Sequence, residues 1–292
     1  MARCLVTGHK GYIGSILYKR LQEQGHEVMG IDIKEGDDIL DTLKPHIDGN
    51  FHRHWVNFRP EYIFHLAAIP RVVYSIENPI EVIENNVLSS LYVLEFARFV
   101  GAKRVIYSSS SSVEGNGDGP ENPYGASKLM PEALCGTWSK IYGVDTVCLR
   151  YFNVYSPCQK ADGPYATAVA NFMESIRQGK SPFITGNGEQ RRDMAHVEDV
   201  VDANIQAMQR KENFEGECFD IGTGDNISLN EIKDIVLEFF PEVQFDYVAD
   251  RPRDVMETRA EIEPFVVQAG WAPSRLIEEG IRECFRDLRD EL

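Results

Sequence analysis

Three glycines, Gly8, Gly11 and Gly14, interrupt an apolar pattern close to the start of the chain. Residues 3–7 before them have the composition of a short buried strand, and apolar residues recur at helical spacing over residues 13–24. Glycines let the backbone turn tightly, and they let a pyrophosphate approach the amino terminus of the following helix. The spacing G-x-x-G-x-x-G therefore predicts the first strand–turn–helix unit of a dinucleotide-binding fold.

An acidic residue completes this unit. A second strand is predicted over residues 27–33, and Asp32 lies at its end, 18 residues after Gly14. A carboxylate at this place accepts hydrogen bonds from ribose hydroxyls and repels a 2′-phosphate, so Asp32 favours NAD over NADP. No arginine stands beside Asp32, although Lys34 is close. The alternative is that Asp32 is only an exposed strand end.

Strands and helices continue to alternate after this unit. Residues 62–66 and 104–108 are predicted to be strands, and residues 79–100 a long helix between them. Such alternation predicts a doubly wound parallel sheet with ligands at the carboxyl ends of its strands. The serine run 108–112 would lie at that edge, although a serine run can also be a flexible linker.

Tyr124 and Lys128 are four residues apart in a predicted helix, so both side chains lie on one face. An unperturbed tyrosine has a pKa of about 10, and a nearby ammonium stabilises its phenolate. A second cation, such as an oxidised nicotinamide, would bring the pKa close to neutral. Asn122 and Pro123 suit the first turn of this helix, whereas Pro131 is expected to kink it. Most isolated pairs of this kind are solvated helix surface.

Composition excludes several classes of protein. A formal net charge of −16 argues against nucleic-acid binding by bulk electrostatics, and no apolar run is long enough to span a membrane. We therefore expect a cytoplasmic protein with no nucleic-acid or membrane partner. His52 and His54 lack the neighbours of a metal site, so no metal is expected. Scattered cysteines fit reduced thiols: Cys4, Cys135, Cys148, Cys158, Cys218 and Cys284.

Taken together, these residues resemble the extended short-chain dehydrogenase/reductases that modify nucleotide sugars. The resemblance starts from the glycine turn, the serine run and the Tyr124–Lys128 pair, and it covers nearly the whole chain. It implies a Rossmann-type α/β fold with NAD as cofactor and a smaller, interleaved α/β lobe for the substrate. Further matching segments are residues 65–68, 149–155, 186–193, 196–200, 222–224, 251–254 and 270–271.

The resemblance also implies roles for single residues in catalysis and cofactor binding. Ser110 would hydrogen-bond the reacting hydroxyl and Tyr124 would act as the base. Lys128 would hold the nicotinamide ribose and lower the pKa of Tyr124. Cofactor contacts are implied for Gly8, Gly11, Tyr12, Ile13, Gly14, Asp32, Asp38, Ile39, Leu66, Ala67, Ala68, Ser108, Tyr124 and Lys128.

A UDP-sugar is the implied substrate, since the resemblance gives arginines that would bind a diphosphate and an acid that would bind the uridine ribose. Arginine suits a diphosphate because its forked donors are fixed. The same arginines could instead pair with neighbouring acids, Asp193 and Asp254. The implied substrate contacts are Ser75, Ser110, Asn153, Arg192, Arg251 and Asp254.

The resemblance implies two domains and a dimer. Residues 1–155 would form the NAD-binding domain and residues 156–292 mainly the substrate lobe, with residues 180–215 returning to the first domain. Helices over 79–100 and 123–142 would pair two subunits into a homodimer, although their apolar residues could equally pack internally. Within the substrate lobe, helices are predicted near Asn171 and over residues 229–240 and 274–288.

The family performs several reactions from one 4-keto intermediate. Its dehydratases carry an Asp-Glu pair where this chain has Ser111 and Ser112, and its decarboxylases carry a glutamate at the second position. Neither serine is a strong acid, so NAD-dependent 4-epimerisation is the leading hypothesis. A 4-keto reductase, a dehydratase or decarboxylase, and a non-catalytic NAD-binding regulator remain alternatives. Thr258 falls where relatives restrict the sugar pocket, and the loop from Ser110 to Tyr124 is short.

Overall fold

In the computed structural model the chain divides into two compact units. The first contains residues 1–150 and 201–219, and the second contains residues 151–200 and 220–292. The first unit thus ends at Arg150 rather than at the predicted residue 155, and the returning segment begins at Val201 rather than near residue 180. The described residues are 1–46, 49–161, 167–249 and 255–292.

A six-stranded sheet forms the centre of the first unit, in the order β2-β1-β3-β4-β5-β8. β1 pairs in parallel with both β2 and β3, and β3 pairs in parallel with β4, so the chain order reverses beside β1. This confirms the predicted doubly wound α/β fold, in which ligands bind where the order reverses. The strands are β1 (Arg3–Thr7), β2 (Glu27–Ile31), β3 (Tyr62–His65), β4 (Arg104–Ser110), β5 (Asp145–Tyr151) and β8 (Cys218–Ile221).

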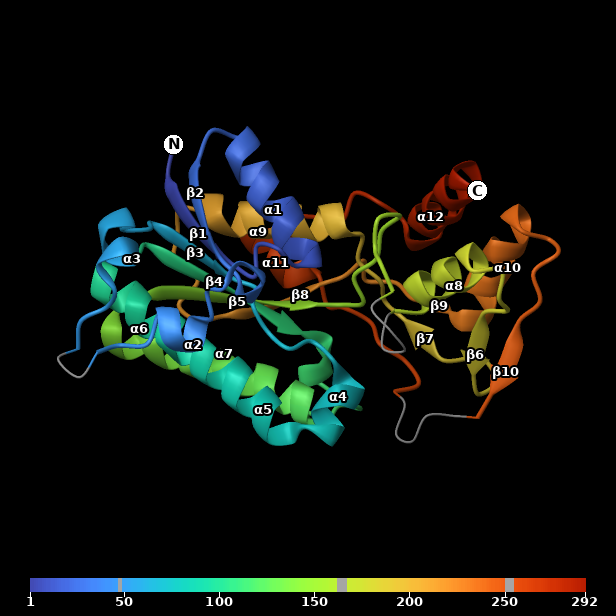
Figure 1. Ribbon diagram of the computed structural model, residues 1–292, viewed down its shortest axis with the longest axis horizontal. Helices are drawn as coiled ribbons and strands as arrows, with labels where there is room; N and C mark the ends of the chain where they lie inside the picture. Colours follow the sequence, from blue (N-terminus) through green and yellow to red (C-terminus); the bar gives the residue numbers. More distant parts are fainter. Residues whose placement is uncertain (47–48, 162–166, 250–254) are drawn as a thin grey trace. The chain divides into compact units, whose positions relative to one another are not determined.

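Helices cover both faces of this sheet (Figure 1). α1 and α9 lie on one face, where Arg20 pairs with Asp202 at 3.0 Å. α2, α3, α6 and α7 lie on the other, and their apolar side chains share one core with Leu5, Ile63 and Val105 of the strands. The helices are α1 (Tyr12–Glu23), α2 (Ile39–Thr42), α3 (Arg53–Phe58), α6 (Ser89–Val100), α7 (Pro123–Tyr142) and α9 (Val197–Gln209), with α4 (Val72–Glu77) before α5 (Pro79–Ile83).

The long helix predicted over residues 79–100 has a π-helical segment, η2 (Glu84–Leu88), between α5 and α6. Asn86 lies in this segment and is buried. Its side-chain oxygen accepts from the backbone N–H of Ile69 at 2.8 Å, and its amide donates to the Ile69 carbonyl at 3.2 Å. π-Segments of this kind often occur at functional sites, and here the segment holds the loop that follows β3.

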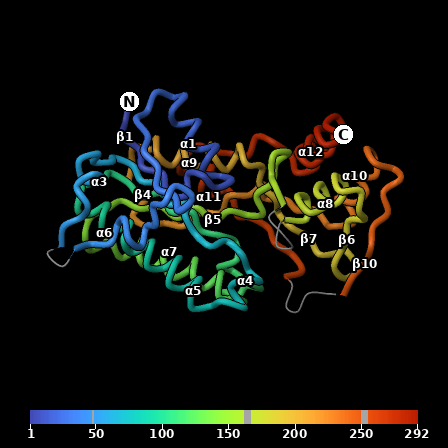
Figure 2. Tube along the Cα trace, in the orientation of Figure 1, coloured from blue at the N-terminus to red at the C-terminus, as the bar shows by residue number. Residues whose placement is uncertain are grey.

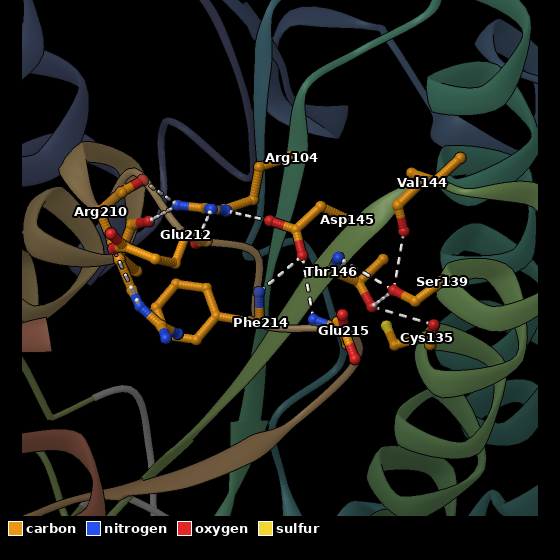
Figure 3. Close-up of polar contacts among 11 residues, drawn as sticks. Arg104, Cys135, Ser139, Val144, Asp145, Thr146, Arg210, Glu212, Phe214 and Glu215 are labelled. Atoms are coloured by element: carbon orange, nitrogen blue, oxygen red, sulfur yellow. Dashed lines mark hydrogen bonds and ion pairs between the residues drawn. The ribbon is translucent and has the colours of Figure 1, made fainter. Parts of the chain in front are cut away.

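Arg104 anchors the returning segment to the sheet of the first unit (Figure 3). It is buried at the start of β4 and pairs with Asp145 at the start of β5. Asp145 in turn accepts from the backbone N–H of Phe214 at 2.8 Å. A cation near the end of α9 also complements the helix dipole. The guanidinium donates to the carbonyl oxygens of Ala207, Arg210 and Glu212.

The second unit combines helices with two short sheets, and Figure 2 traces the path of the chain through it. β6 pairs in parallel with β10, and β7 pairs antiparallel with β9. Ser228 and Glu231 form a reciprocal capping box at the start of α10. The predicted helix over 229–240 is thus confirmed, whereas the last helix begins three residues later than predicted. The elements are β6 (Phe183–Thr185), β7 (Arg191–Arg192), β9 (Ile227–Ser228), β10 (Asp246–Val248), α8 (Ala168–Arg177), α10 (Leu229–Phe239), α11 (Glu263–Ala269) and α12 (Ile277–Glu291).

Three further observations concern the chain as a whole. All six cysteines lie in the described residues and are free thiols. Within those residues, no helix is long and apolar enough to cross a membrane. The same residues contain no group of three or more His, Cys, Asp or Glu side chains arranged to hold a metal ion.

Candidate active site

The glycine turn between β1 and α1 is compact enough to require glycine. Gly8 has a φ of +73°, and a Cβ there would lie 2.9 Å from the backbone nitrogen of Ala67. A Cβ on Gly14 would lie 2.2 Å from the carbonyl oxygen of Gly8. The turn thus lies against the residues that follow β3, as expected at the reversal of a doubly wound sheet. Gly11 caps α1 without a side-chain acceptor, and the predicted contacts Tyr12 and Ile13 form the first helical turn. This bare backbone cradle fits a dinucleotide pyrophosphate.

Asp32 follows β2 rather than lying within it, because the strand ends at Ile31. The residue caps a short 3₁₀ helix, η1 (Ile33–Glu35), and is buried. One carboxylate oxygen accepts from the backbone N–H of Lys34 at 2.9 Å and the other from that of Lys10 at 2.8 Å. The two backbone donors therefore fix the carboxylate beside the glycine turn, where a cofactor ribose is expected.

Asp38 and Ile39, predicted to flank the adenine, begin the short helix α2. The Asp38 carboxylate accepts from the backbone N–H of Leu40 at 2.8 Å. Asp38 also lines a cavity of about 630 Å³ together with Ile33 and Asn85. Ile39 is buried in the core of the first unit. Asp38 is thus the member of the pair whose side chain lies at an open space, and the adenine contact stays a prediction for both.

Tyr124 and Lys128, the predicted catalytic pair, lie in the first two turns of α7. Asn122 caps the helix by accepting from the Gly125 N–H at 2.9 Å, and α7 continues through Pro131 to Tyr142. The backbone N–H of Tyr124 donates to the Ser75 hydroxyl at 3.0 Å. Ser75 is fully buried, so its hydroxyl serves the start of α7 here. A contact between Ser75 and a substrate stays a prediction.

The pKa of Tyr124 is raised in the structure, whereas the sequence led us to expect a lowered value. Burial raises the pKa of the Tyr124 phenol, and its side-chain hydrogen bond with Ser110 lowers that pKa in part. Lys128 is buried too, which lowers its pKa to about 8, while the nearby Glu132 raises it. The Lys128 ammonium donates to the Ser108 carbonyl at 2.9 Å. The expected lowering of the tyrosine pKa is therefore not a property of the chain alone, because the effect of burial outweighs that of the Ser110 hydrogen bond.

A buried polar network behind the pair was not foreseen. His65 bridges the hydroxyls of Thr7 at 2.8 Å and Ser90 at 3.0 Å. Asn86 donates to the Ser127 hydroxyl at 2.9 Å, and Ser127 donates to the Tyr124 carbonyl at 2.7 Å. The network joins the end of β1 to helix α7, since Ser90 also donates to the Asn86 carbonyl at 2.7 Å. Buried polar networks of this kind rigidify a site when every member is satisfied.

A second unforeseen cluster centres on Glu132, one turn beyond Lys128. Its buried carboxylate forms two hydrogen bonds with the guanidinium of Arg150, at 2.9 and 2.8 Å. It also accepts from the Ser109 hydroxyl at 2.6 Å. Arg150 reaches Glu114 at 3.1 Å as well. Helix α7 is thereby tied to the ends of β4 and β5, so the strand end that carries Ser110 is held in place.

Two of the predicted substrate residues, Asn153 and Arg192, lie in the described part of the second unit. Asn153 donates to the Asp193 carbonyl at 3.3 Å, and Arg192 donates to the Arg191 carbonyl at 2.9 Å. The Asp193 carboxylate is fully buried and accepts from four donors, so its role is to close this backbone turn. These donors are the N–H groups of Thr223, Gly224 and Ala260 and the Thr223 hydroxyl. Arg251 and Asp254 lie outside the described residues.

Comparisons with known proteins agree with this fold and identify a family. The family model described as the NAD dependent epimerase/dehydratase family matches residues 4–222. The chain is 32% identical to a UDP-N-acetyl-alpha-D-glucosaminuronate decarboxylase of Bacillus cytotoxicus, over 99% of this chain and 98% of that protein. It is 31% identical to a UDP-glucose 4-epimerase of Mycolicibacterium smegmatis, over 99% of each. A solved UDP-N-acetylglucosamine 4-epimerase of Methanobrevibacter ruminantium, in complex with UDP-N-acetylmuramic acid, superposes with a TM-score of 0.86 at 28% identity, over 100% of this chain and 99% of that one.

Proposed function

Because this chain belongs to the NAD dependent epimerase/dehydratase family, we propose that it is a nucleotide-sugar 4-epimerase. Its substrate would be a UDP-hexose, a UDP-hexuronate or a UDP-N-acetylhexosamine. The observation that carries the proposal is the hydrogen bond between Ser110 and the buried Tyr124, with the buried Lys128 one turn further along the same helix. That pair can move one proton at a sugar hydroxyl and return it.

In the proposed mechanism Ser110 holds the C4 hydroxyl and Tyr124 removes its proton. NAD held at the glycine turn and Asp32 would supply reversible hydride transfer at C4, and its oxidised form would add a positive charge that favours the phenolate. Lys128 contributes a positive charge that burial weakens but does not remove at neutral pH, since its pKa is about 8. Tyr124 then returns the proton to the 4-epimer, so neither cofactor nor proton is consumed.

A decarboxylase is the second candidate, because the chain is similar in sequence to one. Such a reaction also begins with oxidation at C4, so Tyr124 would serve both. The residues that favour epimerisation are Ser111 and Ser112, which occupy a 3₁₀ turn, η3 (Ser111–Val113), directly after β4. Serine hydroxyls cannot act as strong acids at neutral pH, which leaves reversible oxidation without elimination as the simplest chemistry.

The substrate contacts implied by the resemblance are part of this proposal, and the charges of the arginines support them. Arg192 and Arg251 would bind the diphosphate, Asp254 the uridine ribose, and Asn153 the phosphate or sugar, with Ser75 as a further sugar contact. Thr258 is a small residue, and this supports a pocket that admits an acetamido group or a carboxylate. Its hydroxyl accepts from the Asp193 N–H at 3.2 Å, so the side chain has a fixed orientation.

A homodimer is also proposed, through the helices that begin at Pro79 and Pro123. Ile80 on α5 is 73% exposed and Ile141 on α7 is 69% exposed. α5 and α7 contact each other, so these side chains belong to one helical layer. Large exposed apolar side chains on adjacent helices are typical of a subunit interface.

A nucleotide-sugar panel tests the proposed activity. Purified protein with catalytic NAD would be incubated separately with UDP-glucose, UDP-glucuronate, UDP-N-acetylglucosamine and UDP-N-acetylglucosaminuronate, and the products separated by chromatography. At least one substrate should give its 4-epimer without loss of carbon dioxide. The Tyr124→Phe variant should bind NAD and form no product. Release of carbon dioxide without epimer would identify a decarboxylase instead.

A further inference from the structure

We propose that Glu35 sets the coenzyme preference of this chain by holding Lys10 and cancelling its charge beside the ribose site. The proposal rests on the NAD site described above. Asp32 is the acid expected at the ribose hydroxyls. Glu35 is a second carboxylate three residues later, at the end of the same 3₁₀ turn. The structure brings both acids to the glycine turn, and it also brings two lysines there.

Direct contacts fix this arrangement. The Lys10 ammonium lies 2.8 Å from one carboxylate oxygen of Glu35, and His9 Nε2 lies 3.0 Å from the other. His9 is buried, so one carboxylate oxygen of Glu35 contacts an imidazole ring that is packed inside the protein. The Lys34 ammonium donates to the Lys10 carbonyl at 3.1 Å. Asp32 accepts hydrogen bonds from the backbone N–H groups of Lys10 and Lys34. It therefore joins the glycine turn to the 3₁₀ turn, and these two segments carry all four charged side chains.

The charges around the ribose site therefore balance. Lys10 and Lys34 are positive, and Asp32 and Glu35 are negative. A 2′-phosphate carries up to two negative charges, so binding it requires an excess of positive charge. The four side chains around the ribose site have no such excess. Lys10 by itself would suit such a phosphate, because lysine binds phosphate as a point charge. With Glu35 in place, the ammonium already has a carboxylate, and a phosphate beside it would meet the repulsion of that carboxylate.

The ion pair itself is exposed, and exposed pairs are weak. Lys10 can therefore exchange its partner at little cost, and the contact alone does not exclude a phosphate. What excludes the phosphate is the charge balance: the Glu35 carboxylate, which contacts the buried ring of His9, stays beside the site and offsets the charge of Lys10. The Lys10 hydrogen bond lowers the pKa of Glu35, so this charge persists through the neutral range. The preference for NAD thus depends on two acids, Asp32 and Glu35.

Equilibrium binding of NAD, NADP and 2′,5′-ADP tests this role without using turnover. Glu35→Gln keeps the size of the side chain and an oxygen that can face His9. Calorimetric titration should show the ratio of the NADP and NAD dissociation constants falling at least about tenfold, through tighter NADP binding. 2′,5′-ADP should gain affinity by a similar factor. The gain should weaken with added salt, because it is a charge effect.

Two further variants separate Glu35 from its surroundings. Adding Lys10→Gln to Glu35→Gln should return the ratio to the wild-type value, because the freed ammonium is then gone. Glu23→Gln removes an exposed charge at the far end of α1, where Glu23 pairs with Lys19, and should leave the ratio unchanged. A ratio within twofold of wild type in Glu35→Gln would overturn the role of Glu35. Failure of the wild-type chain to bind NAD would instead refute the cofactor site itself.

Discussion

The ammonium of Lys128 donates to the backbone carbonyl of Ser108 at 2.9 Å and lies 5.2 Å from the centre of the Tyr107 ring. Both acceptors belong to β4, so helix α7 is joined to the strand that carries Ser110. The surroundings of this buried cation include one carbonyl and one aromatic face. The arrangement costs stability, since burial disfavours the charged form.

Replacing Lys128 should therefore stabilise the fold while removing activity. The pKa of Lys128 falls from 10.5 to about 8, which corresponds to roughly 3 kcal/mol of cost to the folded state at neutral pH. Lys128→Met should remove this cost but also lose the hydrogen bond to Ser108. The free energy of unfolding in urea at pH 7 should therefore rise by about 1–3 kcal/mol. Between pH 8 and 10.5 the unfolded chain binds more protons than the folded one, so wild-type stability rises with pH. The difference in stability between Lys128→Met and wild type therefore becomes smaller over this range.

The exposed Lys140 on the same helix is the matched control for this change. Lys140→Met should alter stability by less than about 0.5 kcal/mol at either pH. A Lys128→Met variant that is less stable than wild type at pH 7 would contradict the account of the buried cation.

His65 should make the first unit sensitive to acid. Burial is the main reason that its pKa falls from 6.5 to about 3, and the charge of Lys128 adds to this. Below pH 6.5 the unfolded chain takes up a proton that the folded chain refuses, so stability should be lost progressively as pH falls toward 3. His65→Gln should be less stable than wild type at pH 7, with a difference that narrows by a few kcal/mol by pH 4. The exposed His54→Gln variant should keep the wild-type profile, and parallel profiles for all three proteins would refute this prediction.

Removing Asn86 should loosen the start of helix α7. Its side chain satisfies the N–H and carbonyl of Ile69 and the hydroxyl of Ser127. Asn86→Ala should cost about 2–3 kcal/mol in urea unfolding, because these partners lose their hydrogen bonds. The neighbouring, half-buried Asn85→Ala should cost clearly less. Equal losses for the two variants would show that the network adds nothing specific.

Breaking the Arg104–Asp145 pair should be costly because it is buried. Arg104→Met leaves the Asp145 charge without its cation and the carbonyl groups after α9 without their donor. A loss of about 3–5 kcal/mol is expected in urea unfolding. Arg98→Met removes an exposed arginine of α6 and should cost less than 1 kcal/mol. A small loss for Arg104→Met would mean that the returning segment is held by its apolar contacts alone.

The elements of the first unit were predicted well because their signals are local. β1 spans residues 3–7 as expected, and α1 and the capped start of α7 follow from glycine, asparagine and proline at defined positions. β2 was predicted two residues too long, because the Asp32 side chain caps a 3₁₀ turn there and ends the strand.

The supporting residues of the site could not be predicted in the same way. Asn86 contacts Ser127, 41 residues away, and Glu132 contacts Arg150, 18 residues away. In the sequence, polar residues within helical segments have the pattern of ordinary helix surface. Their burial depends on which strands the helices cover, and that is a property of the assembled sheet. The raised pKa of Tyr124 has the same origin, since desolvation depends on packing.

The fate of the hydrogen on sugar C4 tests the proposed epimerisation most directly. The protein would convert a UDP-sugar carrying deuterium at C4, with NAD in catalytic amount, and mass spectrometry would follow the label. Epimerisation through Tyr124 predicts a 4-epimer that keeps the deuterium at C4, with no net change in NAD and no product from Tyr124→Phe. Deuterium lost to solvent, or reduced cofactor consumed in proportion to product, would contradict it.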